Sequence, residues 1–309
     1  MREFREPVAV VGAGTIGLSW AALFAAHGHP VRVVDPRTDL EHAIQDSLSC
    51  YLPQVSVQGN GDRRIAPVRV TSTVAEAVSD VLFVQESGPE QLEFKERIFA
   101  QIEESAPLDA MLVSSSSGIV ASLQSKAMRQ PQRLIIGHPF NPPHVLPLVE
   151  VSADVTTAQT SIDRVLEFYR SLGKVPVQLH KEVPGFVANR LQIVLILEAL
   201  RLVQEGVVSA NELDVIMENS LGIRWASIGP ILAFHLGGGS GGLRHILNHI
   251  GVGLAEAVGQ TLTSETIDRI SDLVQHEYPA SVLQRFIKER DRRQAAIVRD
   301  HAEHPLDHK

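Results

Sequence analysis

The stretch Val8-Ala9-Val10-Val11-Gly12-Ala13-Gly14-Thr15-Ile16-Gly17 decides the fold. It starts with a short run rich in β-branched residues, which predicts a strand, and ends in a Gly-x-Gly-x-x-Gly turn where helical spacing begins. The first glycine permits a tight turn, the second lets the backbone approach a pyrophosphate, and the third lets helix and strand pack closely. Free N–H groups at the helix N-terminus then attract the phosphates. A dinucleotide site is therefore predicted, and glycines that serve only a structural turn are the alternative.

An acidic residue follows the next predicted strand. The apolar run 31–34 leads directly into Asp35, which lies eighteen residues past Gly17. A carboxylate at the end of this strand can bind both ribose hydroxyls and repels a 2′-phosphate. NAD is therefore the predicted cofactor, and the nearby Arg37 keeps NADP as the alternative.

The rest of the chain predicts two domains of different character. Short apolar strands alternate with helical patterns such as 91–104 and 158–172, which is typical of an α/β fold with a Rossmann-type, doubly wound parallel sheet. The further strands are predicted at 68–70, 81–84, 111–113, 134–136 and 175–177. After Pro184 the strand-like runs disappear and long amphipathic patterns follow. We therefore predict an NAD-binding domain over 1–184 and a mostly α-helical domain for substrate and dimerisation over 185–309.

Composition and charge exclude several classes of partner. The 309 residues carry a formal net charge of −8, so the surface repels polyanions and no nucleic acid partner is predicted. The single cysteine, Cys50, cannot form an intramolecular disulfide, which favours a reducing compartment and predicts the cytoplasm.

Two features resemble membrane or metal signals but favour other interpretations. Residues 8–26 carry no charged side chain, yet their glycines and hydroxyls fit a buried strand, turn and helix better than a membrane span. His245 and His249 lie four residues apart, as in some zinc sites, but no HExxH glutamate or third ligand accompanies them. Neither membrane insertion nor a metal is predicted.

Three downstream segments are candidates for the chemistry. They are the serine run with its glycine at 114–118, the segment His138-Pro-Phe-Asn-Pro-Pro at 138–143, and Leu-Val-Glu-Val at 148–151. Loops at the carboxyl ends of parallel strands are where open α/β sheets bind ligands. If Glu150 contacts His138, the carboxylate sets the imidazole tautomer and raises the basicity of the other nitrogen. A solvated serine turn and a histidine satisfied by other polar groups are the alternatives.

Motifs in the same order over nearly the whole chain resemble the L-3-hydroxyacyl-CoA dehydrogenase superfamily. They are the glycine turn with Asp35, the segment 84–90, the serine run, the HPFNPP segment, Glu150, and Pro-Gly-Phe-Val-Ala-Asn-Arg at 184–190. Residues 85–87, 224–226 and 237–242 are most similar to the branch that contains lambda-crystallin, L-gulonate 3-dehydrogenase and L-carnitine dehydrogenase. The resemblance implies an NAD-dependent enzyme that interconverts a small L-3-hydroxy acid and its 3-keto form.

The resemblance also implies a role for individual residues. His138 corresponds to the general base, Glu150 to its orienting partner, and Ser117 and Asn189 to groups that bind and position the substrate. Because the usual Asn-Thr-Ser-Ser is here Ser115-Ser116-Ser117-Gly118, Ser116 is the alternative to Ser117. The implied cofactor contacts are Gly12, Ala13, Gly14, Thr15, Ile16, Gly17, Asp35, Glu90, Lys95, Ser117 and Asn141.

The substrate is interpreted as a free acid. Members that bind a coenzyme A ester supply Ser and Lys after the second strand, whereas residues 39–62 here contain no Lys or Arg, and Gln54 stands where the lysine would be. Arg63 and Arg64 could compensate, so a short-chain L-3-hydroxyacyl-CoA dehydrogenase is the alternative. Arg224 is the candidate for binding a free carboxylate, and capping a helix is its alternative role. The glycines at 237–242 are either a mobile loop near the cleft, contributed in cis or across a dimer, or a simple flexible connector.

The sequence also predicts how the chain assembles. The segment 191–203 is more apolar than one helix needs against its own domain, which favours a subunit interface over core packing, and the resemblance implies a homodimer. A non-catalytic, crystallin-like protein that binds NAD without turnover is the alternative from another class.

Overall fold

The computed structural model describes residues 5–55 and 65–304. The chain divides into two compact units, Met1–Val194 and Leu195–Lys309. The predicted boundary at 184/185 lies ten residues before this division, so the first unit includes the start of α7 (Ala188–Gln204). No helix within the described ranges combines the length and the apolar character needed to cross a membrane.

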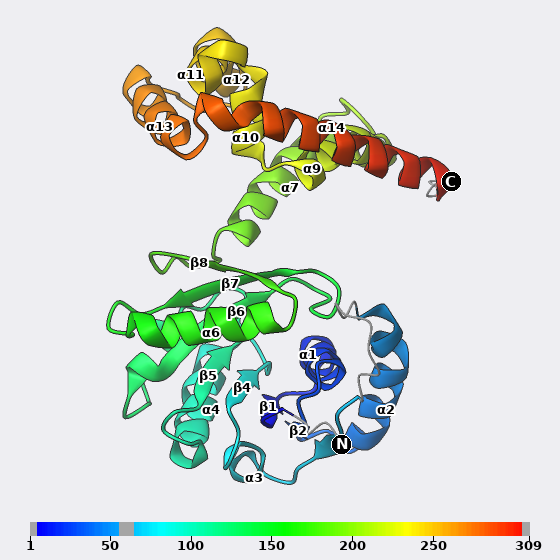
Figure 1. The fold of residues 1–309 in the computed structure, drawn as a ribbon, viewed down its shortest axis with the longest axis vertical. Coiled ribbons are helices and arrows are strands. Elements are labelled where there is room, and N and C mark those ends of the chain that lie inside the picture. Colours follow the sequence, from blue (N-terminus) through cyan, green and yellow to red (C-terminus); the bar gives the residue numbers. More distant parts are fainter. Residues whose placement is uncertain (1–4, 56–64, 305–309) are drawn as a thin grey trace. The chain divides into compact units, whose positions relative to one another are not determined.

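The first unit is built on one eight-stranded sheet with the order β3-β2-β1-β4-β5-β6-β7-β8 (Figure 1). The strands are β1 Val8–Val11, β2 Val31–Val34, β3 Val68–Val70, β4 Phe83–Glu86, β5 Met111–Ser114, β6 Leu134–Pro139, β7 Leu148–Ala153 and β8 Val175–Gln178. All neighbouring pairs are parallel except β6 with β7. This order and the strand–helix alternation confirm the predicted Rossmann-type fold.

The antiparallel strand β7 was not among the predicted strands. Only residues 140–147 separate it from β6. A parallel return needs a crossover of a dozen or more residues, so a connection this short must bring the chain back antiparallel. The short connection was the available signal in the sequence.

Helices cover both faces of this sheet. They are α1 Thr15–Ala26, α2 Leu40–Tyr51, α3 Val74–Val78, α4 Leu92–Ser105, α5 Ala121–Gln124 and α6 Gln159–Ser171. Side chains alternate along a strand, so Val8 and Val10 enter the cluster with α1, α2 and α6, whereas Ala9 and Val11 enter the cluster with α3, α4 and α5. Both clusters contain side chains of the central strands, so the sheet is packed against helices on its two faces.

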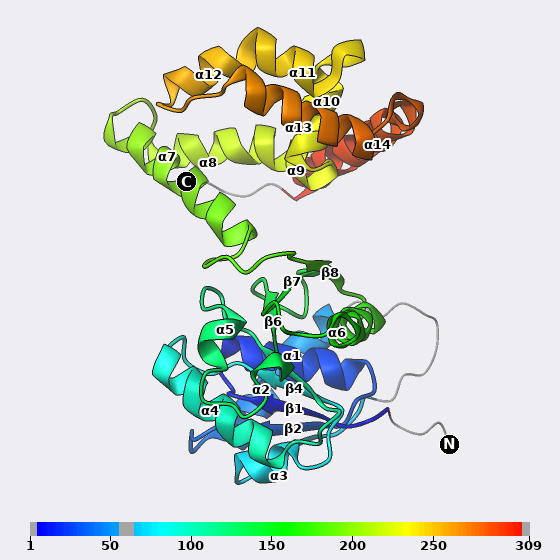
Figure 2. The ribbon, with the colours of Figure 1, turned by 90° about the vertical axis from the view of Figure 1, so that its left-hand side faces the viewer.

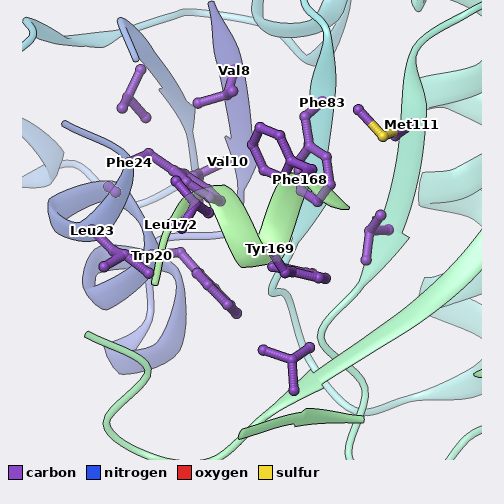
Figure 3. Close-up of a cluster of buried hydrophobic side chains, with 14 of the residues drawn as sticks. Val8, Val10, Trp20, Leu23, Phe24, Phe83, Met111, Phe168, Tyr169 and Leu172 are labelled. Atoms are coloured by element: carbon purple, nitrogen blue, oxygen red, sulfur yellow. The ribbon is translucent and has the colours of Figure 1, made fainter. Parts of the chain in front are cut away.

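Aromatic rings fill the first cluster (Figure 3). Trp20 and Phe24 of α1 stack at 5.5 Å between ring centroids, and Phe83 of β4 stacks on Phe168 of α6 at 4.1 Å. Tyr169 lies between them and is completely buried. This packing holds α1 and α6 side by side against the sheet, and α1 carries the predicted dinucleotide turn at its N-terminus.

The second unit is helical over its described residues (Figure 2). Its helices are α8 Ala210–Met217, α9 Ile223–Ser227, α10 Pro230–Gly237, α11 Gly242–Ile246, α12 Val252–Ala257, α13 Ser264–Glu277 and α14 Ala280–Glu303. The glycine cluster is a tight connection between α10 and α11, and the amide of Leu243 donates to buried His235 Nδ1 at 3.1 Å. A Cβ on Gly242, whose φ is +57°, would lie 2.6 Å from the His235 ring, so this packed connector requires glycine there.

Candidate active site

The turn after β1 has the geometry of a phosphate cradle. Gly12 has a φ of +102°, and a Cβ there would lie 2.7 Å from the backbone of Ser87 and Gly88. A Cβ on Gly17 would lie 1.9 Å from the Gly12 carbonyl oxygen, so α1 can approach the strand only because this residue is glycine. Space next to Gly14 is open, and no described side chain caps the helix that follows it. The first amides of α1 are therefore available to an anion, which fits a pyrophosphate.

Asp35 stands at the end of β2 with its carboxylate held in place. One oxygen accepts the Ala13 amide at 2.7 Å and the other accepts the Arg37 amide at 2.9 Å. A cleft of about 600 Å³ opens beside it, lined among others by Leu40 and Thr71. The Arg37 guanidinium forms a bidentate pair with Asp39, at 2.7 and 2.9 Å. Its charge is thus already matched by a carboxylate, which fits NAD better than a 2′-phosphorylated cofactor.

The antiparallel pair β6 and β7 brings His138 directly opposite Glu150. Glu150 Oε2 lies 2.9 Å from His138 Nδ1, and both side chains are buried. Glu150 Oε1 accepts the amides of Val187 and Ala188, each at 3.0 Å. Burial raises the pKa of the Glu150 carboxyl, but the hydrogen bonds from His138 and from these two amides outweigh it and hold the pKa below its ordinary value. The ionised carboxylate accepts from Nδ1–H, which leaves Nε2 as the basic nitrogen.

Two phenyl rings confine the imidazole. Phe140 and Phe186 each lie 5.2 Å from the His138 ring between centroids. Phe186 is buried and has a φ of +50°, which is unfavourable for a residue with a side chain. Strained backbone at such a position persists where the surroundings fix it, and here it places a ring against the predicted base.

A pocket of about 340 Å³ brings together five of the predicted residues, Ile16, Ser117, His138, Asn141 and Asn189. Its lining consists of Ile16, Ser115, Ser117, His138, Pro139, Phe140, Asn141, Asn189 and Gln192. Asn189 at the start of α7 donates its side-chain amide to the Ser117 carbonyl oxygen at 3.0 Å. The end of the dinucleotide turn, the histidine and the first turn of α7 therefore meet at one cavity.

Glu90 organises the serine run. Its Oε1 accepts the hydroxyl of Ser116 at 2.6 Å and the amides of Ser117 and Gly118 at 3.1 and 2.9 Å. The Ser116 side chain is buried and engaged, whereas Ser117 is exposed and lines the pocket. The geometry favours Ser117 over Ser116 as the residue that meets a ligand.

Two predicted site residues, Lys95 and Arg224, lie away from this pocket. Lys95 is buried, and its ammonium donates to both Glu86 carboxylate oxygens at 2.8 and 2.7 Å, so the structure does not bring it to the pocket. Arg224 lies in the second unit and lines a cavity of about 500 Å³ there. Gln54 bonds the Cys50 carbonyl of its own turn, while Arg63 and Arg64 lie outside the described residues.

Four residues of the pocket lining are not among the predicted site residues: Ser115, Pro139, Phe140 and Gln192. Pro139 and Phe140 were named only as part of the HPFNPP segment. Gln192 follows Asn189 by three positions on α7, and this spacing puts both amides on one helix face, which the sequence could have shown. Ser115 was named only as part of the serine run. His245 and His249 stack at 5.8 Å, and the described residues hold no group of three or more side chains suited to a metal.

Comparison with known proteins identifies the family. The model for the 3-hydroxyacyl-CoA dehydrogenase NAD binding domain matches residues 7–183, and the model for the C-terminal domain of the same enzymes matches residues 185–305. The chain belongs to the 3-hydroxyacyl-CoA dehydrogenase family. Membership makes it an NAD-dependent oxidoreductase, as the dinucleotide turn and the histidine pocket indicate.

Members of this family differ in the substrates for which they are named. L-carnitine dehydrogenase from Nocardiopsis dassonvillei is 38% identical over 302 residues, which is 96% of this chain and 92% of that protein. A 3-hydroxyacyl-CoA dehydrogenase from Gibberella moniliformis is 41% identical over 242 residues, covering 78% of this chain and 75% of that protein. Among solved structures, an NAD⁺-dependent 5-formyl-3-hydroxy-2-methylpyridine 4-carboxylic acid 5-dehydrogenase has a TM-score of 0.72 at 25% identity, covering 94% of this chain and 98% of its own.

Proposed function

We propose that this chain interconverts a small, free L-3-hydroxy acid and its 3-keto form, with His138 as the general base. The observation that carries the proposal is the buried His138–Glu150 pair at the wall of a pocket that the dinucleotide turn also reaches through Ile16. Imidazole exchanges a proton near neutral pH, so the same group serves oxidation and reduction. When bound, NAD supplies the hydride acceptor for C3 of the substrate.

The other residues of the pocket act around this base. Glu150 keeps the Nδ1–H tautomer and stabilises the imidazolium formed when Nε2 takes the proton of the 3-hydroxyl. The Ser117 hydroxyl binds the substrate oxygen, and Asn189 positions the substrate from the first turn of α7. Glu90, Lys95, Asn141 and the glycine turn with Asp35 are proposed on family resemblance as cofactor residues, Lys95 acting through its contact with Glu86.

A free acid is favoured over a thioester by the chemistry near β2. The described residues of α2 and of the turn after it carry no lysine or arginine for the phosphates of coenzyme A. The relatives named L-carnitine dehydrogenase support the same substrate class. Arg224 is proposed as the partner of the free carboxylate. The Gibberella moniliformis relative keeps a short-chain hydroxyacyl-CoA as the second candidate.

Initial rates with NAD test the proposal. L-carnitine, other free L-3-hydroxy acids and L-3-hydroxybutyryl-CoA are compared by the increase in NADH absorbance. We expect kcat/KM to be highest for a free acid, and a clear preference for the thioester would overturn the substrate class. His138→Ala should abolish turnover while NADH binding is retained, and retention of wild-type activity in this variant would end the assignment of the base.

We further propose a lambda-crystallin-like homodimer in the cytoplasm, with the functional domain boundary at 184/185. The dimer is supported by the apolar side chains of α7, since Leu191, Val194 and Leu197 are 63%, 68% and 60% exposed in the single chain. The compartment rests on the lone cysteine, and the boundary on the extents of the two family models. Light scattering of the wild type and of Leu197→Glu tests the dimer, which the variant should dissociate.

A further inference from the structure

A buried chain of hydrogen bonds runs from α6 to the wall of the pocket. The Tyr169 hydroxyl donates to Gln85 Oε1 at 2.7 Å, and Gln85 Nε2 donates to Ser115 Oγ at 2.8 Å. Ser115 Oγ lies 2.8 Å from Ser87 Oγ. Tyr169 and Gln85 are completely buried, whereas the two serines are half-buried. This series of hydrogen bonds therefore connects the buried core to two serine hydroxyls that a ligand can reach.

The residue next to the Tyr169 hydroxyl must be small for this series of hydrogen bonds to form. A Cβ on residue 137 would lie 2.1 Å from the Tyr169 oxygen, so only glycine before His138 admits the phenol. Burial raises the pKa of Tyr169, which therefore stays a neutral donor. With its carbonyl facing the phenol, the Gln85 amide must present N–H to Ser115.

The hydroxyls of Ser115 and Ser87 have hydrogen-bonding capacity that the protein does not use. The two hydroxyls carry two hydrogens, and one of them spans the bond between Ser115 and Ser87. Because Gln85 donates to Ser115, the second hydrogen is not used within the chain of bonds. The pair thus presents one donor, together with unused lone pairs, to a ligand in the pocket.

The position of the pair identifies that ligand. Ser115 lines the pocket with His138 and Ile16. Ser87 packs against the dinucleotide turn, where its backbone lies 2.7 Å from the place of a Cβ on Gly12. A dinucleotide with its pyrophosphate on the turn and its reactive ring beside the base must pass this point. We infer that Ser115 and Ser87 bind the nicotinamide riboside end of NAD, with Gln85 and Tyr169 as positioning residues.

This inference rests on the proposed site and adds contacts to it. It is tested by fluorescence titration with NADH, and by displacement of NADH with ADP and with ADP-ribose. ADP lacks the riboside, so its affinity should be unchanged in Ser115→Ala, whereas NADH should bind about fivefold to tenfold more weakly for the loss of one hydrogen bond. Weakened ADP-ribose would place the bond on the ribose, and unchanged ADP-ribose would place it on the carboxamide. Equal weakening of ADP and NADH, or no weakening, overturns the inference.

Control variants separate this result from other causes. Ser49→Ala removes an exposed hydroxyl whose only described bond is to the Gln45 carbonyl, and it should change neither affinity. If Ser115→Ala does not fold, Ser87→Ala carries the same test. A wild-type protein that does not bind NADH would contradict the proposed function, whereas normal wild-type binding without discrimination by the serine variants would contradict only this inference.

A double-mutant cycle tests the positioning role. In Tyr169→Phe the Gln85 carbonyl loses its donor, so the amide can rotate and take the hydrogen of Ser115. We expect weaker NADH binding with unchanged ADP binding, and no additional loss when Tyr169→Phe is combined with Ser115→Ala. Losses that multiply in the double variant would show that Tyr169 acts through other contacts and would overturn its assignment.

Discussion

Replacing Glu150 by glutamine should convert His138 into the wrong tautomer. The amide has nearly the size of the carboxyl but only one acceptor oxygen. If that oxygen stays on the amides of Val187 and Ala188, both at 3.0 Å, the NH₂ group faces His138 Nδ1 at the position now 2.9 Å away. Nδ1 must then accept, so the hydrogen moves to Nε2 and the base is lost.

The opposite amide orientation is less favourable. It would direct NH₂ at two backbone N–H groups and leave both without an acceptor, at roughly 1–3 kcal/mol each. The carboxylate-to-amide change in a Ser-His-Asp triad lowers kcat by about 10⁴ through the same tautomer effect. We therefore expect kcat to fall by about 10³–10⁴, which corresponds to about 4–5.5 kcal/mol of lost transition-state stabilisation.

The assay is the initial rate of NADH formation at saturating NAD and substrate, with NADH affinity measured separately. Affinity should change by less than about twofold, because the cofactor turn is untouched. Glu103→Gln is a matched control, since Glu103 also accepts two backbone amides, those of Arg129 and Gln130 at 2.7 and 2.8 Å, but has no histidine partner. A Glu150→Gln enzyme with more than about a tenth of the wild-type kcat would refute the tautomer argument.

Three further outcomes are expected. Gly17→Ala places a methyl group 1.9 Å from the Gly12 carbonyl oxygen, so NADH binding measured by fluorescence should be lost, and an unchanged affinity would contradict the role of the turn. The lowered pKa of Glu150 means that its stabilisation is complete above the ordinary value of 4.5 and disappears as the pH falls through the folded-state value; the unfolding free energies of the wild type and Glu150→Gln, measured by urea titration, should therefore converge only in acid. Lys174→Met removes the donor to the carbonyls of Pro143 and Leu146 in the loop after His138. The unfolding free energy should fall by about 1–3 kcal/mol, because part of the loss is offset when an ammonium no longer has to be buried. A variant as stable as the wild type would show that the loop does not depend on Lys174.

Local patterns made much of the fold predictable. The glycine turn and the run of β-branched residues before it are confined to ten residues, so their spacing alone determines a strand, a turn and a helix. His138 and Glu150 could be named as candidates because each ends or follows an apolar run. Their contact could not be established, since it depends on the antiparallel return of β7, which pairs residues twelve positions apart.

Other parts of the site depend on contacts that leave no local pattern. The bond from Tyr169 to Gln85 spans 84 positions and the bond from Gln85 to Ser115 spans 30, so neither has a spacing to recognise. The burial of Lys95 could not be predicted either, because lysine side chains are exposed in most proteins. Lys95 is buried here since it pairs with Glu86, a carboxylate that the fold shields from solvent.

The second oxygen of Glu150 has a consequence for recombination within the family. It bonds the amides of Val187 and Ala188, which are among the first residues matched by the C-terminal family model. The acid that orients the base thus comes from one module, and the donors that hold the acid come from the other. Chimeras that exchange these modules between relatives must therefore preserve the backbone path through positions 187 and 188. Otherwise Glu150 loses these two donors and no longer holds the His138 imidazole in its orientation.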